Sequence, residues 1–357
     1  MIANLATRSR PVYNFLEPVD LSAAAGGDPF FLELAATKAF RRLKSIHFLG
    51  GIDYLLVRSP NGARGNVRYT RYQHSLGVAS LALFYCDAMA LPYTERRLVC
   101  AAALLHDIGH APLSHSLEPV FKEVFGLAHH QANEDIVTGR VPLGVEVYNA
   151  LRSNNVDIER LIAIIAGQEA GYHGFFAGPI NFDTIEGIIR ARAYTKPNPN
   201  KLSPDTVTEA ALRRSGERDR RAVDEFWSYK DQVYRHIINS RTGVLADLAC
   251  QIFMRRNLDA MSPDDYFVTE AQIFHKLPGL RDLLTSRSFE NEILRQVNRP
   301  ISYTARRFYI EPSADFFARD DTDRYRQSKE RCTLLPHRSD AVEPVGLIRD
   351  LFDDHGD

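Results

Sequence analysis

Hydrophobic residues recur every three or four positions along most of this chain, which is the spacing of helices with one buried face. The spacing predicts one helix from position 74 to about 90 and a second from 95 to about 106. Further helices are expected over 29–43, 131–139, 144–153, 157–168 and 181–195, and helical spacing resumes over 207–260. The pattern therefore predicts a mainly all-α fold.

Strand-like patterns are few. Segments 52–57 and 66–70 flank the turn Pro60-Asn61-Gly62, and a third β-rich segment lies at 301–311. Apolar β-formers on both sides of a Pro-Asn-Gly turn are typical of a hairpin. We therefore expect a small β-hairpin in the first half of the chain and one strand near position 305.

These elements divide the chain into five parts. We expect an N-terminal arm (1–34), a helical core (35–195), a proline-rich loop or lid (196–206), a C-terminal helical region (207–320) and a tail rich in Arg and Asp (321–357). The first residues lack the continuous apolar stretch of a signal peptide, and no window holds ~18 uninterrupted apolar residues. These patterns favour a cytoplasmic protein without a membrane partner.

Composition and charge narrow the choice of partners. The 357 residues are 45% hydrophobic and carry 44 Lys and Arg against 45 Asp and Glu, a formal net charge of −1. No global basic field exists to hold nucleic acid, so an anion site must be local. The four cysteines, Cys86, Cys100, Cys250 and Cys332, form no CxxC pair and are expected to be buried free thiols.

The histidines are concentrated in one window. Five of the twelve lie between positions 106 and 130: His106, His110, His115, His129 and His130. The apolar helix that ends near His106 meets Gly109 and Pro112, which break it, so His106 and Asp107 should lie at a helix end beside an opening. Side chains that are adjacent on a helix diverge by about 100°. Another helix must therefore complete any metal site.

Two such helices are available. His74 opens the preceding apolar helix, and Asp183 opens a later one. Together with His106 and Asp107 they offer two imidazoles and two carboxylates, a mixed N/O set suited to a divalent ion such as Mn, Mg, Fe, Zn, Ni or Co. The absence of a thiol argues against a structural zinc site. A metal with open positions would promote hydrolysis of a phosphate ester by activating water.

Further residues could serve a phosphate substrate. Arg71 could bind the anion as a fork, while His110 and His129 could protonate the leaving oxygen or orient water. Glu118 could fix the tautomer of one of these imidazoles. His130 and His173 are candidate substrate-binding residues, although a loop histidine and a plain turn are the simpler interpretations of these two positions.

Three segments of the sequence carry a family likeness. They are Arg71-Tyr72-Gln73-His74-Ser75-Leu76-Gly77-Val78, then His106-Asp107-Ile108-Gly109-His110-Ala111-Pro112-Leu113-Ser114-His115, and the later Phe182-Asp183. They resemble the H…HD…D pattern of HD-domain metal-dependent phosphohydrolases. Within that superfamily the chain is most similar to the dNTP triphosphohydrolases of the sterile-alpha-motif-and-HD-domain and bacterial dGTPase type. The likeness covers about residues 35–195.

The resemblance implies an HD-domain helical core, metal ligation by His74, His106, Asp107 and Asp183, and phosphate binding by Arg71. It also implies catalytic roles for His110, Glu118 and His129, and assembly into a homo-oligomer. The chain departs from that family at Gly187 and Ala191, which stand where a Tyr and an Asp near the sugar are usual, and at Phe48, which replaces a polar residue.

We therefore expect a divalent-metal-dependent phosphohydrolase acting on nucleotides. The best substrate expectation is a dNTP, converted to deoxynucleoside and triphosphate by attack of metal-activated water on phosphorus. The alternatives are another phosphate ester (a mono- or cyclic dinucleotide, or a nucleic-acid end), a di-iron HD-domain oxygenase, and a non-catalytic metal-stabilised sensor.

Overall fold

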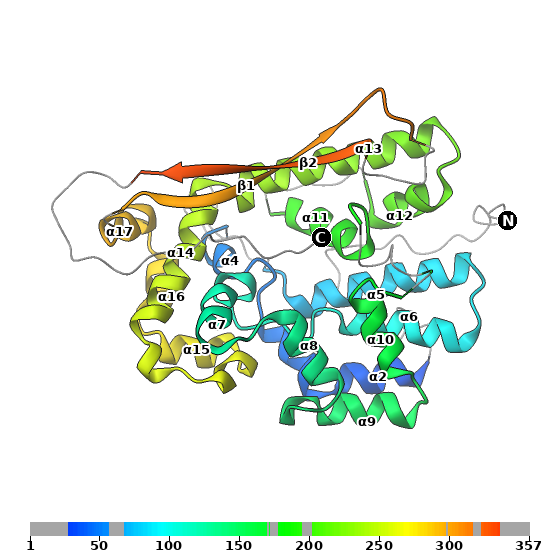
Figure 1. The fold of residues 1–357 in the computed structure, drawn as a ribbon, viewed down its shortest axis with the longest axis horizontal. Helices are drawn as coiled ribbons and strands as arrows, with labels where there is room; N and C mark the ends of the chain where they lie inside the picture. Colours follow the sequence, from blue (N-terminus) through cyan, green and yellow to red (C-terminus); the bar gives the residue numbers. More distant parts are fainter. Residues whose placement is uncertain are drawn as a thin grey trace.

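The computed structural model describes residues 28–56, 68–169, 171, 178–194, 202–297, 299–316 and 323–335. It is mainly helical, as the hydrophobic pattern predicts (Figure 1). The first half of the chain contains α2 (Pro29–Ala36), α3 (Lys38–Arg42), α4 (Gly51–Leu56), α5 (Arg71–Ala88), α6 (Tyr93–Leu105), α7 (Glu118–Phe125), α8 (His129–Val137), α9 (Val145–Ser153), α10 (Ile158–Ile165) and α11 (Phe182–Arg192).

The second half adds α12 (Pro204–Arg213), α13 (Glu217–Val233), α14 (Arg241–Arg256), α15 (Glu270–Lys276), α16 (Leu280–Thr285) and α17 (Phe289–Arg295). A π-helical turn, Tyr234–Ile238, follows α13 directly. The chain then forms two strands, β1 (Ile301–Ile310) and β2 (Tyr325–Leu334), which pair antiparallel from Ile301 opposite Leu334 to Ile310 opposite Tyr325. This ribbon packs along α13 (Figure 1).

Helices α5 and α6 bring the predicted metal ligands His74 and His106 close together. Only residues 89–92 connect them, and a connection this short makes neighbouring helices antiparallel. The N-terminus of α5 therefore lies beside the C-terminus of α6, and the two helices pack closely (Figure 1). A capping box between Thr70 and Gln73 fixes the start of α5. His74 thus meets the end of α6 across this helix pair.

Helix α11 packs against α5 and brings the third part of the site. Asn181 and Thr184 form a capping box at its start. Gly77 of α5 permits the close approach, since a Cβ at that position would lie 2.2 Å from the Glu186 carboxylate. Position 77 therefore requires a glycine, because the buried Glu186 side chain of α11 occupies the space where a Cβ would lie.

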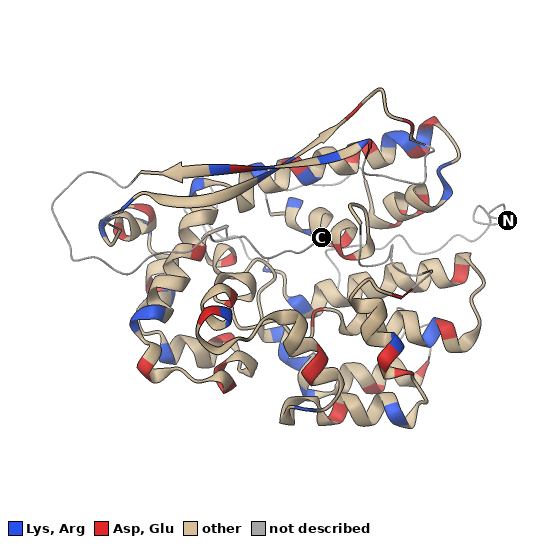
Figure 2. Cartoon of the chain, viewed as in Figure 1, with Lys and Arg blue, Asp and Glu red and all other residues tan. Residues whose placement is uncertain are grey.

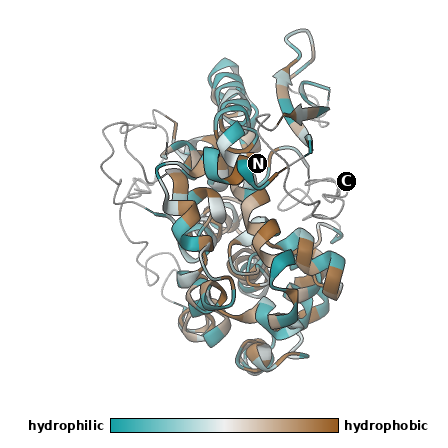
Figure 3. Ribbon diagram, turned by 90° about the vertical axis from the view of Figure 1, so that its left-hand side faces the viewer, coloured by the Kyte–Doolittle hydropathy of each residue, from teal (hydrophilic) through white to brown (hydrophobic). Residues whose placement is uncertain are grey.

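Apolar and polar positions are both present on individual helices (Figure 3), and basic and acidic residues are interspersed (Figure 2). The core includes Trp227, Ile237 and Val244, as the spacing over 207–260 predicts. No disulfide joins the four cysteines. Cys86, Cys100 and Cys250 are buried, as expected, whereas Cys332 on β2 is partly exposed.

The predicted hairpin in the first half is wrong where it can be compared. Residues 51–56 form helix α4, and positions 57–67, with the Pro60-Asn61-Gly62 turn, lie outside the described residues. Ile52, Tyr54 and Leu55 are all buried, because α4 packs against α14 and α16. A short apolar run buried on several sides has the same pattern in a helix as in a strand.

The strand predicted near 301–311 is confirmed as β1. Its partner β2 lies within the segment for which the composition predicts a tail, and its residues Arg326, Lys329, Glu330 and Arg331 explain why no strand was expected there. Of the proline-rich segment 196–206, α12 begins at Pro204, while 196–201 lie outside the described residues.

One buried acid of the C-terminal region gives a stability prediction. Burial raises the pKa of Asp247 to about 7, although a hydrogen bond from Ser116 Oγ at 2.5 Å opposes the shift. The unfolded carboxyl titrates near pH 3.9, at roughly its reference value. As the pH rises from about 4 to 7, the unfolded chain loses a proton from this carboxyl that the folded chain keeps. The free energy of unfolding therefore decreases by up to about 1.4 kcal/mol for each unit by which the pH rises.

We expect Asp247→Asn to remove this loss, because the amide is uncharged and its oxygen still accepts from Ser116. Urea denaturation at pH 4.5 and pH 8 should show a smaller decrease in stability for the variant than for the wild type. An identical decrease in both proteins would contradict the assignment of this titration to Asp247.

Candidate metal centre

The four predicted metal ligands converge on one point, although up to 109 positions separate them in sequence. His74 Nε2 lies 3.0 Å from Asp183 Oδ1, 3.3 Å from His106 Nε2 and 3.6 Å from Asp107 Oδ2. His106 Nε2 lies 3.5 Å from Asp107 Oδ1 and 3.9 Å from Asp183 Oδ1. Ligands held at ~2.1 Å from one ion lie about 3.0–3.4 Å apart, so the cluster has the size of a metal site.

The two imidazoles are oriented as metal ligands. His106 Nδ1 donates to the Ala103 carbonyl oxygen at 2.8 Å, and His74 Nδ1 contacts Glu186 Oε2 at 2.5 Å. When Nδ1 carries the proton in such a bond, the lone pair lies on Nε2. Both Nε2 atoms face the cluster. The donor chemistry therefore fits a divalent ion held by two nitrogens and two carboxylates.

The environment of His74 is strongly anionic. Burial alone would lower the pKa of His74, but the Glu186, Asp183 and Asp107 carboxylates outweigh it and raise the pKa to about 9. Glu186 is itself fully buried and pairs with Arg190, which also donates to the Gln73 carbonyl oxygen. Arg190 is therefore an internal partner of Glu186, as its sequence position suggests.

Glu186 supports a testable prediction. Glu186→Gln should weaken binding of Mn²⁺ by roughly 10–100-fold, the usual effect of changing a carboxylate that orients a ligating histidine. Isothermal titration calorimetry measures the affinity. Glu209→Gln on α12 is the control, because Glu209 pairs with Arg213 at the same i,i+4 spacing as Glu186 with Arg190, and it must not reproduce the loss.

The Arg71 side chain, predicted to bind phosphate, is paired with side chains of the protein. Its Nη1 donates to Asp107 Oδ2 at 2.8 Å and its Nε donates to Ser114 Oγ at 3.1 Å, and the side chain is buried. Burial alone would raise the pKa of Asp107, but Arg71 and the imidazoles of His106 and His110 hold it well below its usual range. Arg71 thus keeps a metal-ligand carboxylate ionised, and its contact with phosphate stays a prediction.

The other predicted histidines form a second cluster next to the first. It consists of His110, His115, Glu118 and His129. Glu118 Oε1 accepts from the backbone N–H of His129 at 2.7 Å and contacts His129 Nδ1 at 2.5 Å, while Oε2 lies 3.1 Å from His115 Nδ1. His110 joins the two clusters, because its Nε2 lies 3.0 Å from Asp107 Oδ1.

The four residues of the second cluster place ligand atoms within 4.8 Å of one another, so they could also hold a metal ion. The rings of His110 and His129 are stacked, 4.8 Å apart and 7° from parallel, which is less suited to sharing one ion between these two imidazoles. Burial and the Arg71 charge lower the pKa of His110 well below its usual range. Neutral His110 can donate from Nε2 to Asp107, which leaves Nδ1 as an acceptor; that atom has no hydrogen-bond partner among the described residues.

The two remaining candidates are less informative. The ring of His130 lies 3.9 Å from that of His129, and burial together with His129 lowers its pKa to about 4. His130 is therefore neutral beside the cluster. His173, the other candidate, lies outside the described residues.

The centre opens on one side. The side chain of Asp183 is 46% exposed and that of His115 is 45% exposed, whereas His74 is fully buried. Phe48 packs on His74 with ring centroids 4.8 Å apart, and a Cβ at Gly187 would lie 3.3 Å from Phe48 and 3.5 Å from His74. Phe48 and Gly187 therefore pack closely against His74 and form an apolar wall on this side of the centre.

Several residues around the centre escaped the sequence analysis. Asn133 of α8 donates to the carbonyl oxygens of Leu105 and His106 at 2.7 Å, so it closes the end of α6. Arg42 of α3 donates to the His110 carbonyl oxygen at 2.7 Å. Both make side-chain contacts with distant backbone, which leave no pattern in the sequence.

Lys230 of α13 also escaped notice. It is buried, its Nζ donates to the Pro179 carbonyl oxygen at 3.0 Å, and it lies over the rings of Trp227 and Phe308. Burial lowers its pKa to about 7, and the charge of nearby Asp183 opposes the shift. Lys230 is thus a cation within electrostatic reach of the centre, supplied by the C-terminal region.

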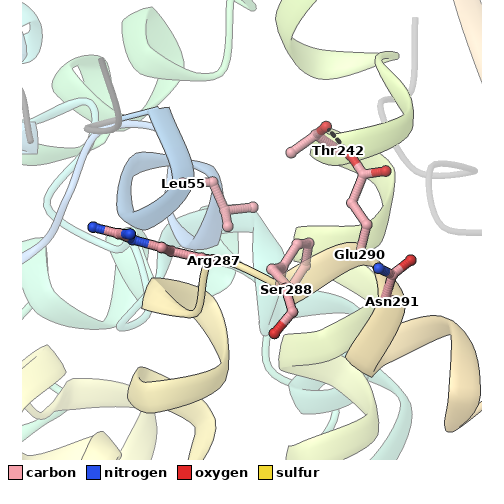
Figure 4. A pocket seen from close by; sticks show the side chains of 7 residues that line it. Leu55, Thr242, Arg287, Ser288, Glu290 and Asn291 are labelled. Carbon is pink, nitrogen blue, oxygen red and sulfur yellow. Dashed lines mark hydrogen bonds between the residues drawn. The ribbon is translucent and has the colours of Figure 1, made fainter. Parts of the chain in front are cut away.

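A separate hollow of about 330 Å³ lies between α4, α14 and α17 (Figure 4). Leu55, Arg287 and Asn291 line it, and Thr242 donates to Glu290 at its edge. None of the candidate metal ligands contributes to this hollow, so it is distinct from the centre.

Across the part of the chain that the structure describes, every helix is too short or too polar to cross a membrane.

Part of the chain is similar to known proteins. The family model of the HD domain matches residues 71–173. The chain is 34% identical over 136 residues to the uncharacterized protein MG461 homolog of Mycoplasma pneumoniae, which covers 37% of this chain and 30% of that protein. It is 36% identical over 130 residues to the uncharacterized protein YwfO of Bacillus subtilis, covering 35% and 26%.

It is also 37% identical over 100 residues to the deoxynucleoside triphosphate triphosphohydrolase SAMHD1 of Mus musculus, covering 26% of this chain and 14% of that enzyme. The chain thus spans less than a third of the length of each of these relatives. The matched segment contains His74, His106 and Asp107, and Asp183 follows ten residues after it. This chain therefore carries an HD domain over residues 71–173.

Proposed function

We propose that the chain is a divalent-metal-dependent phosphohydrolase that acts on nucleotides. The observation that carries the proposal is that His74 and His106 lie 3.0–3.9 Å from carboxylate oxygens of Asp107 and Asp183, next to the second cluster of His110, His115, Glu118 and His129. A divalent ion bound by these four residues would lower the pKa of a water molecule and neutralise phosphate oxygens.

The residues of the second cluster have complementary roles in this proposal. Glu118 holds Nδ1 of His129 and leaves its Nε2 to exchange a proton with the leaving oxygen. His110 offers its bare Nδ1 as an acceptor for water. Arg71 keeps Asp107 ionised and is also near enough to the centre to bind phosphate after a change of rotamer.

The substrate we favour is a dNTP, cleaved to deoxynucleoside and triphosphate. The support is the similarity to relatives named deoxynucleoside triphosphate triphosphohydrolase. The apolar wall of Phe48 and Gly187 offers no hydrogen-bonding side chain to a sugar at that point. We therefore expect weak discrimination between ribose and deoxyribose.

The test is a screen of the purified chain with Mn²⁺, Mg²⁺, Fe²⁺ and Zn²⁺ against dNTPs, NTPs, monophosphates and cyclic dinucleotides, with products separated by anion-exchange chromatography. Triphosphate release supports the favoured reaction. Orthophosphate or a linear dinucleotide would keep the phosphohydrolase and replace the substrate. Oxygen uptake with two irons per chain, and no phosphate product, would overturn the proposal.

A further inference from the structure

Glu270, the first residue of α15, lies outside the matched HD segment and is buried against it. Its Oε1 accepts from the backbone N–H groups of His47 at 2.7 Å and Leu113 at 3.2 Å. Its Oε2 accepts from the Tyr54 hydroxyl at 2.7 Å and pairs with His47 Nδ1. One buried carboxylate from the C-terminal region thus binds two segments of the core that are distant in sequence.

One of these segments is conformationally costly. Leu113 and Ser114 have φ values of +58° and +48°, in the left-handed region that favours glycine. Residues in this region are strained unless their surroundings hold them. The hydrogen bond from the Leu113 N–H to Glu270 is one such restraint. Gly50 provides another, since a Cβ there would lie 2.2 Å from the Leu113 carbonyl oxygen.

The same turn supports both halves of the centre. Ser114 Oγ donates to the His47 carbonyl oxygen at 2.8 Å and accepts from Arg71 Nε at 3.1 Å, and Arg71 binds the metal-ligand carboxylate of Asp107. The next residue, His115, contacts Glu118. A shift of the turn would therefore move Arg71 on one side and the second cluster, through His115, on the other.

We propose that Glu270 is a positioning residue, which sets the Leu113–Ser114 turn and, through Ser114 and Arg71, the orientation of Asp107. As a statement about catalysis this rests on the proposed function. As a statement about the turn and the metal ligands it stands on the contacts alone. It makes the C-terminal region a required part of the centre and not an appendage to the HD domain.

The first measurement is hydrogen–deuterium exchange on the full chain without metal, with Glu270→Ala compared with wild type. The Leu113 amide loses its acceptor in this variant, so exchange in a peptide spanning 108–117 should accelerate at least tenfold. Glu290→Ala is the matched control, because Glu290 is a carboxylate of the same region that accepts from Thr242 far from the turn. It should leave this peptide unchanged.

The second measurement is Mn²⁺ affinity by calorimetry. Glu270→Ala should weaken binding at least tenfold, while Glu270→Gln, whose oxygen still accepts from both backbone N–H groups, should stay within about threefold, the scatter expected for independent sites. Equal losses for Ala and Gln would show that only the negative charge matters, and would overturn the positioning role.

Ser114→Ala extends the test along the chain of contacts and serves if Glu270→Ala does not fold. Ser114→Ala should weaken Mn²⁺ binding by itself. The double variant of Ser114→Ala and Glu270→Ala should lose less binding free energy than the sum of the losses of the two single variants. Wild-type affinity for Ser114→Ala, or unchanged exchange for Glu270→Ala, overturns the inference. Neither readout uses turnover, so a chain that hydrolyses no phosphate ester refutes the proposed function without touching this result.

Discussion

Asp183→Asn is expected to abolish hydrolysis and to weaken Mn²⁺ binding by more than the roughly 10–100-fold that follows the loss of a partner behind a ligand. The reason is that Asp183 Oδ1 lies 3.0 Å from His74 Nε2 and 3.9 Å from His106 Nε2, so this oxygen is a member of the proposed ligand set. The amide keeps the shape of the side chain but lacks the negative charge that strengthens binding of a divalent ion.

The control is Asp205→Asn. Asp183 is the second residue of α11 and Asp205 is the second residue of α12, so both acids stabilise a helix N-terminus in the same way. Calorimetry and product analysis should show that only the Asp183 variant loses metal and activity, while both have similar thermal stability. Full metal affinity in Asp183→Asn would mean that the centre binds its ion without this carboxylate, and the proposed ligand set would be wrong.

Three of the proposed ligands could be placed from the sequence because each lies at a helix end. His74 near the start of α5, His106 at the end of α6 and Asp183 at the start of α11 could be placed from helical periodicity. The short connection 89–92 then fixed the first two beside each other. Local patterns were sufficient because the geometry of a helix pair follows from its connection.

The supporting contacts could not be predicted in this way. Glu270, Asn133 and Arg42 act through hydrogen bonds to backbone groups 27 to 226 positions away, and such bonds impose no periodicity on the sequence. Helix α4 was mistaken for a strand because its apolar side chains are buried on several sides. Strand β2 was missed because nearly all of its side chains outside the two ends are polar. In each case tertiary contacts, and not local pattern, decide the outcome.

The second cluster, which consists of His110, His115, Glu118 and His129, gives a different prediction, in which turnover falls and metal affinity does not. His129→Ala is expected to lower kcat by about 10²–10⁴-fold, the usual contribution of a positioned acid or base. Mn²⁺ affinity should stay close to that of wild type, because His129 contacts Glu118, His110 and His115 of the second cluster. Single-turnover assays at saturating metal separate this loss from one of binding.

Glu118→Gln should reproduce part of the loss, since Gln can still accept from the backbone N–H of His129 but no longer offers a carboxylate to its Nδ1. His236→Ala, which removes an exposed histidine of the π-helical turn, controls for the loss of an imidazole. If His129→Ala lowered metal affinity and kcat together, the second cluster would be part of the metal site. If it changed neither, proton transfer would have to be assigned to His110, whose Nε2 already contacts Asp107 and whose Nδ1 is free to accept.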